Sequence, residues 1–161
     1  MQVYAEAEAV QAIANDLIAT YHPTLATAKF RFLFKEKASK KGGKVQPGSV
    51  KKLSDQMLFL IDANFLMEIP LETWNEMDAT KRVALIDHLL ERCVGEEDED
   101  GGGDMKWSVR EPDVNEFATI LRRYGAWHDD LAAFVSVGQS IDLGYLTEVE
   151  SSTETVQTTT N

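Results

Sequence analysis

Hydrophobic residues recur along the chain at two spacings, which predict helices and strands. The first series has the three- and four-residue spacing of an amphipathic helix and ends before His22-Pro23. Its members are Val10, Ile13, Ala14, Leu17, Ile18 and Tyr21. Two later series alternate with polar residues as β-strands do: Phe30, Phe32 and Phe34, and then Phe65, Met67 and Ile69. Residues 51–61 fit either a strand at their start or a helix, and both alternatives stay open.

The second half of the chain predicts three longer helices. Asp78 can cap the first, whose buried stripe would be Val83, Ile86, Leu90 and Cys93. The second would follow Asp113, end at Gly125 and face inward through Val114, Phe117, Ala118 and Leu121. The third would span residues 129–137. The acidic run 96–104 predicts a mobile loop, and Trp107 and Val109 predict a brief strand. Together these elements predict an α+β fold, a small mostly antiparallel sheet packed by helices on one face.

Length and composition predict one globular domain, residues 1–137, followed by a largely disordered Ser/Thr/Glu-rich tail, residues 138–161. No apolar run approaches the roughly 20 residues of a membrane span, and no signal peptide is recognisable, so we expect no membrane partner. The single cysteine, Cys93, excludes an internal disulfide and favours a reducing compartment. On its predicted helix this thiol should be buried and inert.

The net charge of −11 is distributed unevenly along the chain. Residues 29–52 hold nine Lys and Arg against one acid, Glu36, for a net charge of +8. The other 137 residues hold seven basic and 26 acidic side chains, for a net charge of −19. Such a basic segment is typical of a solvated hairpin, and it could also bind nucleic acid phosphates. The candidate contacts are Lys35, Lys37, Lys40, Lys41 and Lys44.

The stretch ALIDHLLERC, residues 84–93, lies where the helical pattern would place the H-E-x-x-H motif of a zinc peptidase. That motif needs two imidazoles one turn apart to hold zinc and a Glu to take a proton from the bound water. Here His88 begins the frame, but Leu89 stands at the Glu position and Arg92 at the second His position. Leu89 cannot accept a proton, and Arg92 is a permanent cation that would repel a metal.

The order of these segments resembles the putative phage metallopeptidase family over roughly residues 5–135. The marks that carry the resemblance are Asp87-His88, Cys93, Trp107, Asp113-Val114, Glu116-Phe117, Arg123 and Gly125 to Trp127. In that family the helix reads like D-H-E-L-C-H-C and the later segment begins with a His, which is Pro112 here. The resemblance implies a minimal zincin-like arrangement and the cytoplasm of a bacterial host. Of the polar positions expected near its metal, His88, Asp113 and Glu116 remain.

These departures predict a metallopeptidase-like phage or prophage protein that has lost catalysis and binds a host or phage macromolecule. We therefore expect no catalytic residue and no bound cofactor. One alternative is an active, atypical zinc metallopeptidase, with His88 and Glu116 as ligands. Another is a nucleic-acid-binding module that uses residues 29–52.

Asp113 and Glu116 also have a structural interpretation. Asp-x-x-Glu at a helix start is close to a capping box, in which each side chain bonds an unpaired backbone N–H. Glu116 could instead be a former metal ligand that faces His88. In that case Arg92 could replace the lost ion by pairing with Glu116 or Asp113.

Overall fold

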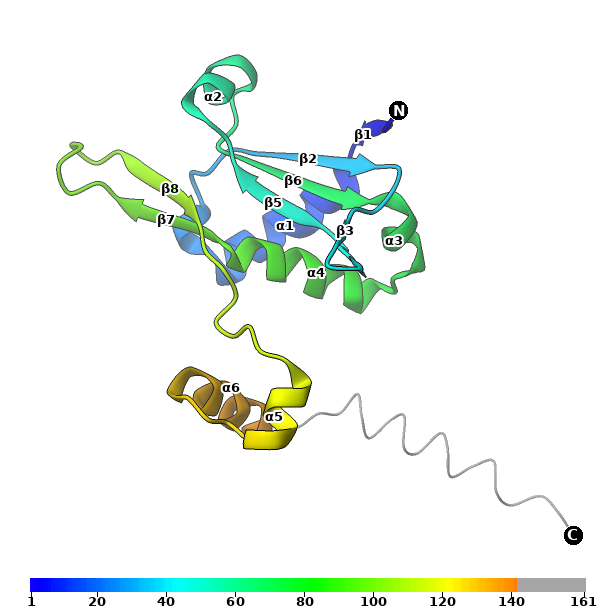
Figure 1. Cartoon of the computed structure of the whole chain (residues 1–161). Helices are drawn as coiled ribbons and strands as arrows, with labels where there is room; N and C mark the ends of the chain where they lie inside the picture. Colours follow the sequence, from blue (N-terminus) through cyan, green and yellow to red (C-terminus); the bar gives the residue numbers. More distant parts are fainter. Residues whose placement is uncertain (142–161) are drawn as a thin grey trace, which may run out of the picture. The chain divides into compact units, whose positions relative to one another are not determined.

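The computed structural model describes residues 1–141, which fall into two compact units (Figure 1). The N-terminal unit spans residues 1–111, and the C-terminal unit begins at Pro112. Among the described residues no helix is both long and apolar enough to cross a bilayer. The predicted tail, residues 138–161, begins inside the last helix, and from residue 142 onward it lies outside the described residues.

A four-stranded sheet organises the N-terminal unit. Its strand order is β1 (Tyr4–Glu6), β2 (Phe30–Lys35), β6 (Phe65–Pro70) and β5 (Ser49–Lys52). The central pair β2 and β6 is parallel, with Phe30 opposite Phe65, and the two outer pairings are antiparallel. The two alternating series therefore form neighbouring central strands. Their alternation puts Phe32, Phe65, Met67 and Ile69 into the core.

Helices α1 (Glu8–Tyr21) and α4 (Ala79–Glu91) contact each other and lie on the same face of this sheet (Figure 1). Asp78 caps α4, as predicted: its carboxylate accepts a hydrogen bond from the Lys81 backbone N–H at 2.8 Å. Short helix α3 (Leu71–Glu76) follows β6, and its Trp74 is buried. The predicted α+β class, with a mostly antiparallel sheet and helices on one face, is confirmed.

The buried stripe of α4 differs from the prediction. It consists of Leu85, Ile86, Leu89 and Leu90. Val83 is 41% exposed, so its predicted burial is wrong. Cys93 is buried as predicted, but it begins strand β7 (Cys93–Glu97) because the helix ends at Glu91.

Residues 51–61 contain both elements that the pattern allowed. Strand β5 ends at Lys52, and Ser54 then caps α2 (Asp55–Ile61) by accepting from the Met57 backbone N–H at 3.3 Å. No residue of α2 is buried, and Phe59 is 88% exposed. Earlier in the chain, β3 (Lys40–Lys41) and β4 (Lys44–Val45) form a small hairpin. Its turn, Gly42-Gly43, has two positive φ angles, as tight hairpin turns require.

A second hairpin consists of β7 and β8 (Met105–Val109), so the predicted brief strand at Trp107 is confirmed. The acidic run was predicted as a loop over residues 96–104, but Glu96 and Glu97 pair with β8 inside β7, so that residues 98–104 alone join the two strands. At its base, Gly95 lies between Trp107 and the 3-10 turn η1 (Pro23–Leu25). A Cβ added at Gly95 would lie 2.4 Å from the Trp107 ring and 2.8 Å from the Thr24 carbonyl oxygen. Residue 95 must therefore be glycine for η1 and the hairpin to pack this closely.

We expect Gly95→Ala to lower the free energy of unfolding by about 2 kcal/mol, because one of the clashing atoms is backbone and must move. Urea denaturation measures this change. Gly48→Ala is the matched control, since its added Cβ would meet the flexible ends of Ile69 and Leu89. A loss at Gly95 no larger than that at Gly48 would contradict the expectation.

The described part of the C-terminal unit contains α5 (Ala118–Tyr124) and α6 (Asp129–Ser140). Gly125 ends α5 with φ 67°, as predicted. His128 caps α6 through Nδ1, which accepts from the Leu131 backbone N–H at 3.3 Å. The predicted inward face of α5 is wrong at three of its four positions: Phe117 is 75% exposed, Leu121 is 37% exposed and Ala118 is exposed. Leu131 is the buried residue of this pair of helices.

Candidate functional site

The predicted peptidase frame, His88 to Arg92, lies at the end of α4. His88 is exposed and makes no hydrogen bond or ion pair among residues 1–141. Leu89, at the position predicted to correspond to the catalytic Glu, is only 2% exposed and belongs to the main hydrophobic core. Arg92 follows the helix as its C-cap. The frame therefore offers one solvated imidazole, one core side chain and one guanidinium.

The guanidinium of Arg92 binds the chain that leaves strand β8. Its Nε donates to the Arg110 carbonyl oxygen at 3.3 Å, and its Nη2 donates to the Glu111 carboxylate at 3.3 Å. The backbone N–H of Arg110 in turn donates to the Arg92 carbonyl oxygen at 2.8 Å. Arg92 thus has a structural role and a carboxylate partner, Glu111. Its predicted pairing with Glu116 or Asp113 stays a prediction.

We expect Arg92→Ala to lower the free energy of unfolding by about 1 kcal/mol, because its carboxylate partner is solvated. The Glu111 side chain is 86% exposed, so the pair is screened by water. Equilibrium urea denaturation gives the change, with Lys81→Ala on the same helix as a control for loss of one positive charge. A loss of 3 kcal/mol or more, typical of a broken buried pair, would show that Arg92 has a less solvated partner than Glu111.

A polar network lies beside the frame, and the pattern of the sequence did not predict it. His22, which is 8% exposed, places Nε2 2.6 Å from the Asp87 carboxylate and Nδ1 3.7 Å from that of Glu91. Arg110 completes the network by donating to the Glu91 carboxylate and, at 2.9 Å, to its carbonyl oxygen. His22 was predicted to end a helix, and it does cap α1. The i, i+4 spacing of Asp87 and Glu91 was the available signal for a shared partner.

Cys93 offers no reactive thiol next to this frame. Burial raises its pKa to about 12, and the positive charge of Arg92 only partly opposes that effect. Its Sγ lies 3.5 Å from the Leu89 carbonyl oxygen, to which the thiol can donate. The thiol is therefore protonated at neutral pH and is a poor nucleophile or metal ligand.

The capping box predicted for Asp113 and Glu116 is not formed. Helix α5 begins at Ala118 with Phe117 as its N-cap, so Asp113 lies outside the helix start. Glu116 accepts from the Phe117 backbone N–H at 2.7 Å and from Trp127 Nε1 at 3.0 Å. These two bonds, the backbone bond first, hold the pKa of the Glu116 carboxyl below its usual value. The carboxylate thus links the start of α5 to the turn before α6.

The structure describes no group of three or more His, Cys, Asp or Glu side chains arranged to hold a metal ion within residues 1–141. His88 and Glu116, the ligands considered for zinc, lie in different units. The expectation that no metal binds stays a prediction.

The basic segment is divided between the two ends of the sheet. Lys29 pairs with Asp62 at 2.6 Å and Arg31 with Glu6 at 2.7 Å, near the start of β2. Lys35 donates to the Ser39 hydroxyl at 2.9 Å. At the other end, four exposed lysines have no ion pair within the described part of the chain, and we call them the hairpin lysines: Lys37, Lys40, Lys41 and Lys44.

Helix α4 and its C-cap, in this α+β unit, carry the segment predicted to correspond to the zinc-peptidase motif. The model of the putative phage metallopeptidase family matches residues 2–135. The chain therefore belongs to that family, and the predicted resemblance is confirmed. No curated protein matches the chain. No solved structure matches it either.

Proposed function

We propose that this chain is a non-catalytic member of its family and acts by binding a host or phage macromolecule in the cytoplasm of a bacterial host. The observation that carries the proposal is the burial of Leu89, at the position of the general base. In an active peptidase this position must present a carboxylate to a metal-bound water. Here it packs in the core with Ile86 and Leu90.

The surroundings of Arg92 support the same proposal. A ligand imidazole at this position would have to face a metal, whereas Arg92 holds the backbone that leaves β8. The remaining frame residue, His88, is a single ligand, and catalytic zinc needs three from the protein. Retention of the fold without the base and the second ligand favours a binding role.

We expect the purified chain to contain no stoichiometric zinc and to cleave no unfolded protein substrate when zinc is supplied. Elemental analysis after dialysis against a weak chelator measures the first, and a casein assay with and without added zinc measures the second. One zinc per chain together with chelator-sensitive cleavage would contradict the proposal. It would favour an atypical zinc peptidase, and loss of that zinc in His88→Ala and Glu116→Gln would identify the ligands.

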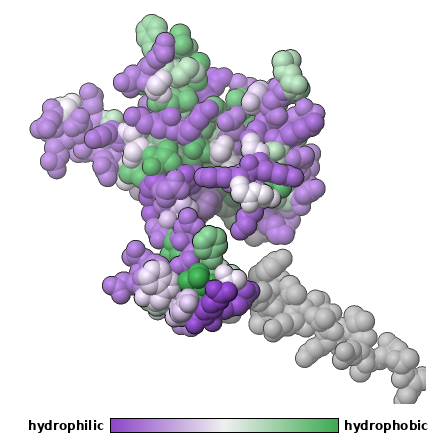
Figure 2. All heavy atoms as spheres, viewed as in Figure 1, coloured by the Kyte–Doolittle hydropathy of each residue, from purple (hydrophilic) through white to green (hydrophobic). Residues whose placement is uncertain are grey.

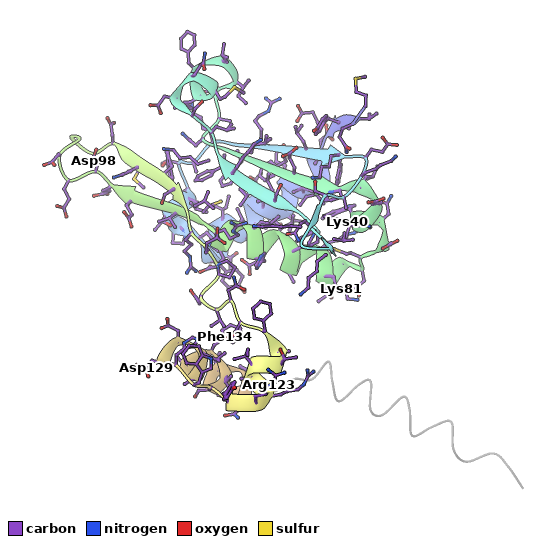
Figure 3. All side chains as sticks on the ribbon, viewed as in Figure 1. Lys40, Lys81, Asp98, Arg123, Asp129 and Phe134 are labelled. Carbon is purple, nitrogen blue, oxygen red and sulfur yellow. The ribbon has the colours of Figure 1, made fainter. Side chains whose placement is uncertain are left out.

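The hairpin lysines favour a second candidate function, binding of nucleic acid. They surround a turn that lies exposed, and their ammonium groups have no carboxylate to neutralise them among residues 1–141. Lys40, one of these four residues, is labelled in Figure 3. Phe30, Phe32 and Phe34 pack into or against the core, so they are not available to stack on bases. Any such binding would therefore act on phosphates and would not read sequence.

A further inference from the structure

The C-terminal unit exposes most of its large hydrophobic side chains. Figure 2 shows hydrophobic residues on its surface. Side chains that are more than half exposed occur on both sides of the turn between the helices: Phe117, Tyr124, Trp127, Phe134 and Val137. Leu131, at 3%, is the residue that this unit buries within its described part. Within residues 112–141, one buried large side chain supplies little hydrophobic stabilisation.

Both described helices of the C-terminal unit are short. They have 7 and 12 residues, and helices of this length are marginal in water unless an apolar face packs. Between them lies an almost wholly apolar hollow of about 330 Å³, lined by Val114, Phe117, Leu121, Leu131, Phe134 and Val135.

The charges beside this face are arranged in two opposite groups. Arg122 and Arg123 lie in the last turn of α5, and Asp129 and Asp130 lie in the first turn of α6. None of these four makes an ion pair within residues 1–141. Figure 3 shows Arg123 and Asp129 on opposite sides of the helix pair. A face with unpaired cations on one side and unpaired anions on the other is complementary to itself.

We propose that the α5–α6 face binds the same face of a second copy of this chain. A two-fold axis through the face places the arginines of each copy opposite the aspartates of the other, so the charge pairing occurs twice. The two helix pairs then form a four-helix arrangement whose core contains both copies of Phe134 and Leu121. The charges determine the orientation, and the apolar side chains supply the larger part of the affinity.

The apolar part is tested by the mass of the full chain in solution. Light scattering after size exclusion, over a hundredfold range of concentration, should show a dimer. Phe134→Ser should raise the dimer dissociation constant about tenfold or more, because a central aromatic anchor is lost. Phe59→Ser is the matched control, since Phe59 is an exposed aromatic in the other unit, at 88% against 58% for Phe134. It should leave the dimer unchanged.

The charge part is tested by exchange of signs. A chain with Arg122→Glu and Arg123→Glu should be monomeric, and so should a chain with Asp129→Lys and Asp130→Lys. An equimolar mixture of the two should dimerise again, as should a chain that carries all four changes. Circular dichroism shows whether each variant keeps its helices.

Three results would overturn the proposal. A wild-type chain that is monomeric at every concentration would exclude a second copy of the chain as the partner of this face. A dimer that Phe134→Ser does not weaken would place the interface elsewhere. Folded sign-exchanged chains that fail to dimerise when mixed would exclude the two-fold pairing.

Discussion

Leu89→Glu should destabilise the N-terminal unit strongly at pH 7 and much less at pH 4. The side chain of residue 89 is 2% exposed and lies in the core, so an ionised carboxylate there would lose its hydration. Burial raises the pKa of such a Glu by several units. We expect the free energy of unfolding at pH 7 to fall about 3–4 kcal/mol further than in Leu89→Gln, which changes shape and polarity in the same way without the charge.

The sign of the pH dependence follows from proton binding. With its pKa raised in the folded state, the folded chain binds more protons than the unfolded chain between the two pKa values. The free energy of unfolding therefore falls as pH rises through this range. Below the pKa of the unfolded state, Leu89→Glu should be no less stable than Leu89→Gln on account of its charge. Urea denaturation of both variants at a series of pH values gives the difference between them, in which the titration of all other groups cancels.

This pair of variants also tests the proposed loss of catalysis. If residue 89 faced a solvated site, as the base of a working peptidase must, Glu and Gln would have similar effects on stability at pH 7. Equal stability of the two variants would therefore contradict the proposal that core packing has replaced the base. The comparison requires no knowledge of a substrate or of a metal.

Local patterns in the sequence predicted the elements that form the sheet and its cover. The alternation of Phe30, Phe32 and Phe34 requires only that one face of a strand be buried, and β2 has this arrangement. The His22-Pro23 pair ended α1 for a local reason, since Pro cannot continue a helix. The stripe of α4 was predicted less well because helix spacing alone does not show which side faces the sheet, and Val83 lies on the exposed side.

The candidate site depended on tertiary contacts, which no local pattern contains. The partner of Arg92 comes from the end of β8, and that of Asp87 from the end of α1. The basic segment illustrates the same limit. In the sequence its charges form one segment. In the fold, β2 runs from one end of the sheet to the other and so separates Lys29 from Lys40. Strand β5 runs back in the opposite direction and places Lys52 opposite Phe65, at the start of β6. The number of charges could be read from the sequence, but their separation to the two ends of the sheet could not.

This division of charge permits a controlled test of nucleic acid binding. If the four hairpin lysines each neutralise one phosphate of duplex DNA, the logarithm of the affinity should fall with the logarithm of salt concentration with a slope of about −3.6. Between 50 and 200 mM salt the affinity should then fall about 150-fold. Fluorescence anisotropy with a labelled duplex measures both values. Replacement of the four hairpin lysines by Ser should remove most of this slope with little change in melting temperature, because the side chains are exposed.

The matched control removes the same charge from the opposite end of the sheet, by Ser at Lys29, Arg31, Lys51 and Lys52. Both quadruple variants lower the net charge by four, so a general electrostatic effect would weaken binding equally in the two. A local phosphate contact would weaken it only in the hairpin variant. Lys29 and Arg31 already pair with Asp62 and Glu6, so their ammonium and guanidinium groups are partly neutralised within the chain. Equal losses in the two variants, or no binding to DNA or RNA at low salt, would exclude the hairpin as a nucleic acid site.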